Sequence, residues 1–381
     1  MKTNFDLLQS DLKVFGLHKA ISFQLFFILT ILLLNACQDK KEPSETPLNQ
    51  AEIAKIDIHT HYRADKPFLV SLLQEWNMKT VLVEVARTDS TGVKEYWPEL
   101  KAQHAKHPDQ FFLCTGFNAF GIDDPAFAQN IIKKLETDIS QGAKMVKVWK
   151  NFGMVDKDQS GAYVQIDDPR LQPIWDFLIA KDIPVIAHIG EPLQAWRPLQ
   201  EGNPHYNYYA NNPQYHAYLH PEIPSWETIM AARDHWLANN PDLIVVGAHM
   251  GSMSFDVDVV AERLEKYPNF YVETAARWGD ITGQESEKVR QFFIKYQDRV
   301  LYGTDLATSP SEEDQTPEAL KEEGDRIRKI IGLDWQYLSG TDSLYYDSPM
   351  ISFPVSTKSL ALPKEVLQKF YWENAAKVLK M

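Results

Sequence analysis

Short apolar stretches alternate with amphipathic segments from residue 53 to the end of the chain. Most of these stretches lack strict alternation of apolar and polar positions, which is typical of parallel strands covered on both faces. Eight of them are predicted strands: 53–61, 80–87, 111–117, 144–150, 183–190, 243–249, 269–275 and 299–305. Helical spacing is seen between them, near 67–77, 94–107, 125–141, 170–181, 226–239, 256–267 and 285–297, and in a last helix from Pro363 to about Leu379.

Eight strands alternating with eight helices predict an α/β protein with a (β/α)8 TIM barrel. The competing fold is a doubly wound open sheet, which would gather its site at one switch point. Two connections are too long for simple turns: the aromatic-rich residues 191–225 and the residues 306–362, with an acidic helical stretch around 314–331. Both follow the carboxyl end of a strand, the fifth and the eighth, so we expect them to cover a pocket. For the first, an interface is an equal alternative.

Metal-ligand residue types stand at the ends of four of these strands. His59-Thr60-His61 closes the first, His188 the fifth, His249 the sixth and Asp305 the eighth. Residues two apart in a strand face the same side, so His59 and His61 point into one space. The other strands of a barrel can deliver their residues to the same rim. Imidazoles with a carboxylate suit zinc, manganese or iron, and an open position is characteristic of a catalytic site.

Composition narrows the class of protein. The chain has 381 residues, 44% hydrophobic and 12% aromatic, which is enough for a large core and fits one barrel with long loops. Its net charge of -13 leaves no basic stripe to neutralise phosphates. Nucleic acid is therefore not an expected partner, whereas a small-molecule substrate is. A homo-oligomer is left open.

The amino terminus is predicted to be a processing segment. Lys13 and Lys19 precede an apolar stretch of 14 residues, 21–34, which is short for a membrane-spanning helix and suits a signal-peptide core. Leu34-Asn-Ala-Cys37 then resembles a bacterial lipoprotein box. Residues 1–36 are thus a predicted lipoprotein signal peptide, with lipid on Cys37. The alternative is an uncleaved anchor helix.

Residues 37–52 are polar with two prolines and are predicted to form a flexible tether to a catalytic domain, residues 53–381. The expected location is the cell envelope, with the protein held at a bacterial membrane only through its lipid. With Cys37 lipidated, Cys114 has no partner for a disulfide and is expected to be a small buried core residue.

In this order and strand context, His59-Thr-His61, His188, His249 and Asp305 resemble the amidohydrolase superfamily. Leu301-Tyr-Gly-Thr-Asp305 and the closing Phe370-Tyr-Trp-Glu-Asn-Ala-Ala-Lys-Val-Leu resemble its amidohydrolase-related branch, amidohydrolase 2. The resemblance covers about residues 53–381. It implies one divalent metal ion, with zinc expected and manganese as an alternative.

The resemblance also implies roles. His59, His61, His188 and Asp305 match the metal ligands of the family's one-metal sites. His249 matches a histidine that orients or polarises the reacting group, and Asp305 also matches a proton shuttle. The physics agrees, because a divalent metal makes hydroxide available near neutral pH, a carboxylate can take up the proton and an imidazole can stabilise developing negative charge.

Further candidates lie near the same rim. Arg87, ending the second predicted strand, could bind a substrate carboxylate or form a surface salt bridge. Lys147 on the fourth strand is expected to point inward, toward a second metal, a substrate anion or Glu84. Glu191 and Arg277 are rim residues or solvated loop residues. Gly247 and Gly303 lie two residues before His249 and Asp305 and are expected to leave room beneath the site.

The sequence thus predicts a metal-dependent hydrolase of a small cyclic ester or amide, such as a lactone. The runner-up is a metal-dependent non-oxidative decarboxylase of an aromatic or unsaturated carboxylic acid. A metal-free lactonase and a binding module that has lost catalysis are the remaining alternatives. Release of carbon dioxide separates the first two, and metal analysis separates the third.

Overall fold

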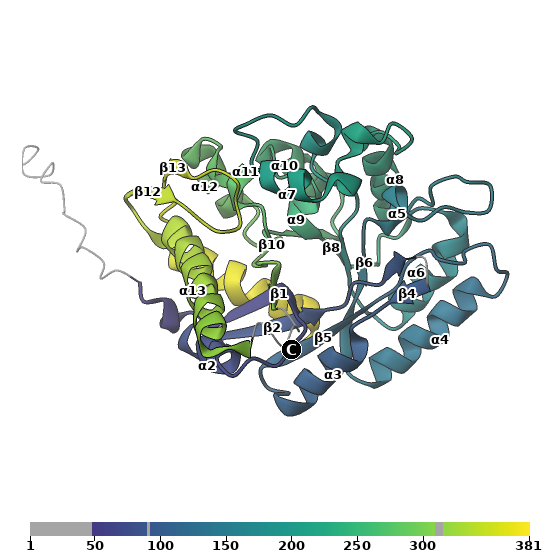
Figure 1. Cartoon of the computed structure of the whole chain (residues 1–381), viewed down its shortest axis with the longest axis horizontal. Helices are drawn as coiled ribbons and strands as arrows, with labels where there is room; N and C mark the ends of the chain where they lie inside the picture. The colour runs from purple at the N-terminus through teal and green to yellow at the C-terminus, as the bar shows by residue number, and fades with distance from the viewer. Residues whose placement is uncertain (1–47, 90–91, 309–314) are drawn as a thin grey trace, which may run out of the picture. The chain divides into compact units, whose positions relative to one another are not determined.

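A sheet of parallel strands forms the centre of the computed structural model, which describes residues 48–89, 92–308 and 315–381 (Figure 1). The order of its strands is β10-β9-β8-β7-β6-β5-β2-β1-β11. Their bounds are Lys55–Tyr62 for β1, Met78–Val83 for β2, Phe111–Gly116 for β5, Ala143–Val148 for β6, Val185–Ala187 for β7, Val245–Gly247 for β8, Phe270–Glu273 for β9, Val300–Leu301 for β10 and Leu306–Thr308 for β11.

The two strands at the ends of this order belong to one stretch of chain, residues 300–308. β10 pairs with β9, and β11 pairs with β1. Between them, the Tyr302 carbonyl accepts from Ile58 N at 3.0 Å, and Asp305 N donates to the His59 carbonyl at 2.8 Å. Residues 300–308 therefore border both β9 and β1, as the last strand of an eight-stranded barrel does. The predicted (β/α)8 barrel is confirmed.

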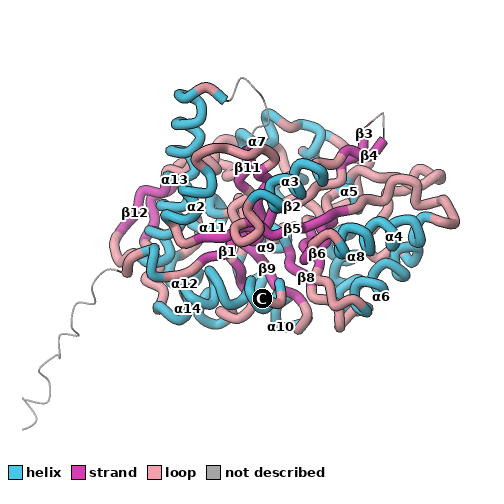
Figure 2. Tube along the Cα trace, turned by 90° about the horizontal axis from the view of Figure 1, so that it is seen from below, coloured by secondary structure: helices cyan, strands magenta, loops and turns pink. Residues whose placement is uncertain are grey.

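Helices follow the strands as predicted and enclose them, as Figure 2 shows. They are α2 (Leu69–Glu75), α3 (Trp97–Lys106), α4 (Phe127–Ser140), α6 (Gln172–Ala180), α8 (Trp226–Asn239), α10 (Val257–Lys266) and α12 (Ser286–Lys295). The closing helix consists of α14 (Lys364–Gln368), a π-helical turn η7 (Lys369–Glu373) and α15 (Asn374–Leu379). The Asn374 amide donates to the Val300 carbonyl at 2.8 Å, which ties this helix to the start of the eighth strand.

A one-residue register shift in β1 turns its two histidines toward the inside of the barrel. Asp57 pairs with Thr80, but Thr60 pairs with Leu82, so β1 holds one extra residue between these pairs. Ile56 below the shift and Ile58 within it pack in an apolar cluster with residues of the other strands and of α15. Because a bulge exchanges the two faces of a strand, the odd-numbered residues above it take over the inward direction.

The two long connections meet each other. The first carries η3 (Leu193–Trp196), α7 (Tyr206–Asn211), η4 (Pro213–Tyr215) and η5 (Ala217–Leu219), and the second carries α13 (Pro317–Ser339), β12 (Ser343–Tyr346) and β13 (Val355–Lys358). Asn207 N donates to Ser352 Oγ at 2.9 Å, and the Tyr206 and Phe353 rings are 5.9 Å apart. The expected acidic helix is α13, and β11, placed by sequence in the loop, completes the last strand.

Two boundaries differ from the sequence prediction. The second strand ends at Val83, and Arg87 instead begins β3 (Arg87–Asp89), which pairs with β4 (Gly92–Lys94) in a small hairpin. The end of the expected tether is part of the fold, since residues 50–52 form a 3-10 turn whose Ala51 carbonyl accepts from the Asn77 amide at 3.0 Å.

Cys114 is buried in the apolar cluster, as predicted for a core residue. The predicted signal peptide and Cys37 lie outside the described residues. Within the part of the chain that the structure describes, no helix has the length and apolar character needed to cross a membrane.

Candidate active site

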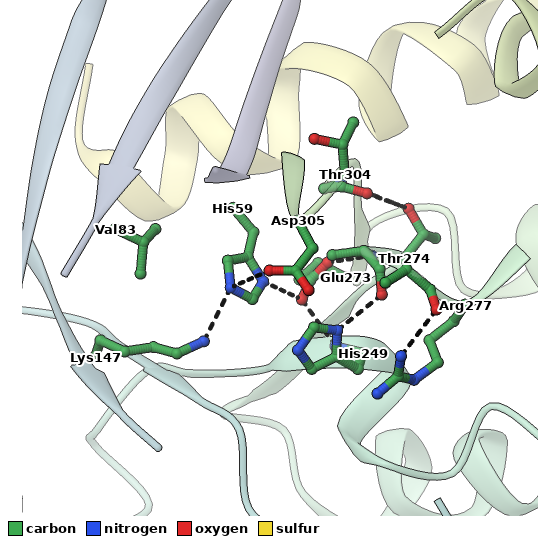
Figure 3. A network of polar contacts seen from close by, with 12 residues as sticks. His59, Val83, Lys147, His249, Glu273, Thr274, Arg277, Thr304 and Asp305 are labelled. Atoms are coloured by element: carbon green, nitrogen blue, oxygen red, sulfur yellow. Dashed lines mark hydrogen bonds and ion pairs between the residues drawn. The ribbon is translucent and has the colours of Figure 1, made fainter. Parts of the chain in front are cut away.

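Three of the predicted ligands converge at the carboxyl ends of the first and last strands. His61 Nε2 lies 3.0 Å from Asp305 Oδ1, and His59 Nε2 lies 3.6 Å from the same oxygen. One ligand atom from each of the three residues lies within 4.8 Å of the other two. Figure 3 shows Asp305 reaching over His59 from the eighth strand.

The hydrogen bond made by one ring nitrogen of a histidine determines whether the other nitrogen is a donor or an acceptor. His61 Nδ1 donates to the Val83 carbonyl at 2.9 Å, since a carbonyl can only accept. Burial lowers the pKa of His61 to about 4, so its ring is neutral and its Nε2 carries a lone pair. Two acceptors, this nitrogen and the Asp305 carboxylate, therefore face each other at 3.0 Å. A cation between them relieves this conflict, so the donor set fits a divalent metal.

Glu273 at the end of β9 holds the other histidine, and sequence reasoning missed it. Its Oε1 is 2.9 Å from His59 Nδ1 and also accepts from His249 N at 2.8 Å. The carboxylate is fully buried. It keeps the His59 proton on Nδ1, so Nε2 carries the lone pair that a metal would bind, the arrangement that carboxylates commonly give ligand histidines. The signal in the sequence is an acidic residue closing the apolar run Phe270-Tyr-Val-Glu273.

Gly303 makes room for this contact. A Cβ there would lie 2.3 Å from Glu273 Oε2 and 3.2 Å from His59 Cβ. The expected space beneath the site is thus filled by Glu273. Gly247 does something else, because a Cβ there would lie 2.5 Å from the Phe270 ring. It accommodates core packing rather than the site.

His249 and His188 lie next to this group. Their rings are 4.2 Å apart, and the His249 ring is 5.0 Å from that of His59. His249 Nδ1 donates to the Ala275 carbonyl at 2.8 Å, whereas His188 Nε2 is buried without a hydrogen-bond partner among the described residues. Burial lowers the pKa of both imidazoles well below its usual value, so both are neutral. The neutral His249 ring therefore presents an acceptor nitrogen, not the donor expected from sequence.

Lys147 points inward, as expected. Its side chain is buried, and Nζ lies 3.1 Å from His59 Nε2. Burial lowers the Lys147 pKa to about 8. Its partner is His59, a predicted metal ligand, and not Glu84, whose carboxylate accepts from Val85 N and Tyr96 N at 2.8 and 2.7 Å.

A cavity of about 360 Å³ opens above these groups. His188, His249 and Asp305 line it, as do residues 204, 205, 207, 208, 211 and 212 of the first long connection and 349–352 of the second. The first connection thus covers the pocket, as one of its two interpretations predicted. Three lining residues hold left-handed backbone without being glycine: His249 (φ 59°), Ala276 (φ 52°) and Asp305 (φ 64°). Such strain costs about 1–3 kcal/mol per residue and commonly gathers at functional sites.

Two of the three other rim candidates line the cavity, and one does not. Arg277 is 7% exposed and lines the cavity. Glu191 also lines it and is paired with the buried Lys150 amine. Arg87 is exposed, with its guanidinium 5.3 Å from the Trp149 ring, and is not among the residues lining the cavity.

The sequence as a whole has a known family. The family model described as amidohydrolase (Amidohydro_2) matches residues 56–381. The chain belongs to the amidohydrolase 2 family. It is therefore a metal-dependent enzyme of the amidohydrolase superfamily, and the resemblance drawn from its motifs is confirmed.

Individual relatives are distant. The chain is 28% identical over 105 residues to a gamma-resorcylate decarboxylase of Rhodococcus jostii, a match that spans 28% of this chain and only 30% of that relative's length. Among solved structures it is similar to a 2,6-dihydroxybenzoate decarboxylase from Rhizobium (14% identity, 86% and 99% of the two chains, TM-score 0.47). It is also similar to a probable 2-pyrone-4,6-dicarboxylic acid hydrolase from Acinetobacter baumannii (11% identity, 86% and 100%, TM-score 0.45).

Proposed function

We propose that this amidohydrolase hydrolyses a small cyclic ester or amide, of the lactone type, with one divalent metal held by His59, His61, His188 and Asp305. The observation that carries the proposal is the 3.0 Å approach of two acceptors, His61 Nε2 and Asp305 Oδ1. Zinc and manganese both suit imidazoles with a carboxylate. When bound, the metal supplies a Lewis acid that polarises a carbonyl group and makes water more acidic.

The chain's own residues supply the proton transfers. Burial would raise the pKa of Asp305, but nearby positive charge, to which Lys147 contributes, holds it below its usual value, so the carboxylate is ionised and can accept the proton of an attacking water. Lys147, a cation at neutral pH whose Nζ lies 3.1 Å from His59 Nε2, can stabilise the oxyanion that develops on the ester carbonyl. His249, with an acceptor nitrogen toward the cavity, can accept a hydrogen bond from the attacking water and orient it, and the proton taken up by Asp305 then passes to the leaving alkoxide.

The proposal is tested with ring opening of simple five- and six-membered lactones in water enriched in oxygen-18. Incorporation of one solvent oxygen into the hydroxy acid supports hydrolysis. Asp305→Asn should lower turnover by at least a hundredfold, as expected when a general base is lost. The control is Asp298→Asn, because the Asp298 side chain is 69% exposed to solvent. Full activity after exhaustive chelation would refute the metal requirement.

The second candidate is a metal-dependent non-oxidative decarboxylase of an aromatic or unsaturated acid. The similarity to gamma-resorcylate decarboxylase favours it, over the 105 residues that match. Release of carbon dioxide, with solvent hydrogen appearing on the product carbon, would assign the chain to this reaction in place of hydrolysis.

A further inference from the structure

Arg277 occupies an unusual position above the seventh strand. It follows the strained Ala276 and lines the same cavity as His188, His249 and Asp305. Figure 3 shows its guanidinium beside the His249 ring. The side chain is 7% exposed, so almost all of its contacts are with protein and with the contents of the cavity.

The guanidinium is poorly satisfied by the protein. Nη1 donates to the carbonyl of the preceding residue, Ala276, at 2.8 Å, and Nε is buried without a partner. No ion pair of Arg277 occurs among residues 48–89, 92–308 and 315–381. Asp280, three residues later, is already used, because it accepts from His205 Nε2 at 2.8 Å and from the Ser254 hydroxyl.

Another buried arginine of this protein, Arg233, has its guanidinium hydrogen-bonded within the protein. Arg233, 2% exposed, donates from Nη1 to the Gly251 carbonyl at 2.7 Å and from Nε and Nη2 to Asp234 at 3.0 and 2.6 Å. Its donors are engaged by an acceptor and a counter-charge. Arg277 has the Asp280 charge nearby but, within the described part of the chain, no carboxylate in contact with it. A buried charge without a directly paired counter-ion is costly, which indicates a site for an anionic ligand.

The residues that line the cavity indicate what kind of ligand could bind beside Arg277. They combine apolar side chains, such as Pro204 and Ile351, with polar ones such as Asn207, so both kinds of group can contact a ligand. A volume of about 360 Å³ accommodates a small molecule. The anion that fits a buried planar fork of donors best is a carboxylate, which a guanidinium binds through two parallel hydrogen bonds.

We propose that Arg277 is a specificity-determining residue that binds a carboxylate of the substrate, remote from the bond that is broken. The substrate class is then a compact cyclic ester or amide that carries a carboxylate group. The substrate part of this inference rests on the proposed function, whereas the carboxylate site itself does not. Arg277 acts by binding and orienting, and no proton transfer is assigned to it.

Binding is measured without turnover, by titration calorimetry of the metal-free full-length protein with benzoate and with benzamide, its neutral counterpart of the same shape. Omitting the metal removes its own affinity for carboxylates. We expect wild type to prefer benzoate at least tenfold. Arg277→Gln should reduce the preference to within twofold, and Arg277→Lys, which keeps the charge but loses the fork, should fall between. Arg290→Gln on α12, outside the cavity lining, should match wild type.

Two results overturn the inference: no benzoate preference in wild type, or an unchanged preference in Arg277→Gln. If Arg277→Gln fails to fold, Arg277→Lys is the deciding variant. A benzoate preference equal to that of wild type in Arg277→Lys would show that the paired guanidinium hydrogen bonds are not needed and would overturn the inference. The outcomes of the two proposals remain distinct. A benzoate preference with no lactone hydrolysis refutes the proposed function only, and hydrolysis of neutral lactones without that preference refutes only the carboxylate site.

Discussion

His59 Nδ1 lies 2.9 Å from Oε1 of Glu273, a carboxylate with no solvent exposure on the neighbouring side of the barrel. This contact fixes which nitrogen of His59 faces Asp305. The same carboxylate accepts from the backbone of His249 and from Ala275 N. One buried group thus orients residues from the first, sixth and seventh strands.

Glu273→Gln is expected to weaken metal binding by about 10- to 100-fold, the usual effect of losing a carboxylate that orients a ligand. The glutamine amide also cannot accept at both of its ends, so one backbone N–H would lose its partner, at about 1–3 kcal/mol of folding stability. Metal affinity is measured by competition with a fluorescent chelator. Glu285→Gln, at the exposed start of α12, should leave metal affinity unchanged. Unaltered affinity in Glu273→Gln would show that His59 needs no such support.

Gly303→Ala is expected to abolish metal binding, because the added Cβ would lie 2.3 Å from Glu273 Oε2. The carboxylate must move, and His59 loses its orientation. The matched control is Gly332→Ala in α13, where the nearest atom to a new Cβ is 3.9 Å away. There, helix propensity predicts a gain of up to about 1 kcal/mol. Metal content after purification and thermal unfolding distinguish the two variants, and a Gly303→Ala protein with full metal content would contradict the packing argument.

Local signals made the strands and most of the site predictable. Apolar runs closing on His61, His188, His249 and Asp305 are visible in the sequence because strand and ligand are contiguous there. Glu273 was missed because its role depends on barrel closure, which brings its side chain on the seventh strand to His59 on the first, with the eighth strand between them. The residues around Glu273 in the sequence also do not indicate that its carboxylate packs against Gly303, where a side chain would clash with it.

Arg87 was placed on the second strand because apolar residues continue to Ala86. The strand ends earlier because the Glu84 carboxylate takes up the backbone N–H groups of Val85 and Tyr96. A side chain that binds the backbone in this way competes with strand pairing and turns the chain into the β3–β4 hairpin. Such long-range competition is not encoded in apolar periodicity.

The buried Lys150–Glu191 pair joins the fourth strand's end to the start of the first long connection. Lys150 Nζ also donates to Tyr208 at 2.8 Å and lies 3.6 Å from the Tyr215 ring centre. Glu191→Gln should destabilise the protein by about 3–5 kcal/mol, because it leaves a buried ammonium unpaired. Lys150→Met combined with Glu191→Leu should recover most of that loss. Chemical unfolding measures both, and a double variant no more stable than Glu191→Gln would contradict this reasoning.

We also propose, from the sequence alone, that Cys37 carries lipid and that residues 1–36 are removed. Cys37→Ala should then remain at precursor mass or lose its membrane association, as seen by fractionation and intact-mass spectrometry. Cys114→Ala is the control, because that thiol is buried in the barrel. Wild-type protein isolated with Met1 intact would contradict the processing.

The metal-free protein is expected to lose stability as the pH falls below about 6.5. Burial lowers the pKa of His61 to about 4 and those of His188 and His249 well below their usual value. Below about 6.5, histidines of the unfolded chain take up protons that the folded protein does not, so the unfolded state is favoured. Each histidine contributes at most about 1.4 kcal/mol per pH unit, and for His61 this loss continues down to about pH 4. Urea unfolding midpoints between pH 7.5 and 4.5 measure the slope. His188→Asn should reduce it, whereas His235→Asn, whose ring is 59% exposed, should keep the wild-type slope. A flat profile between pH 7 and 5 would mean that these rings are not held neutral by burial.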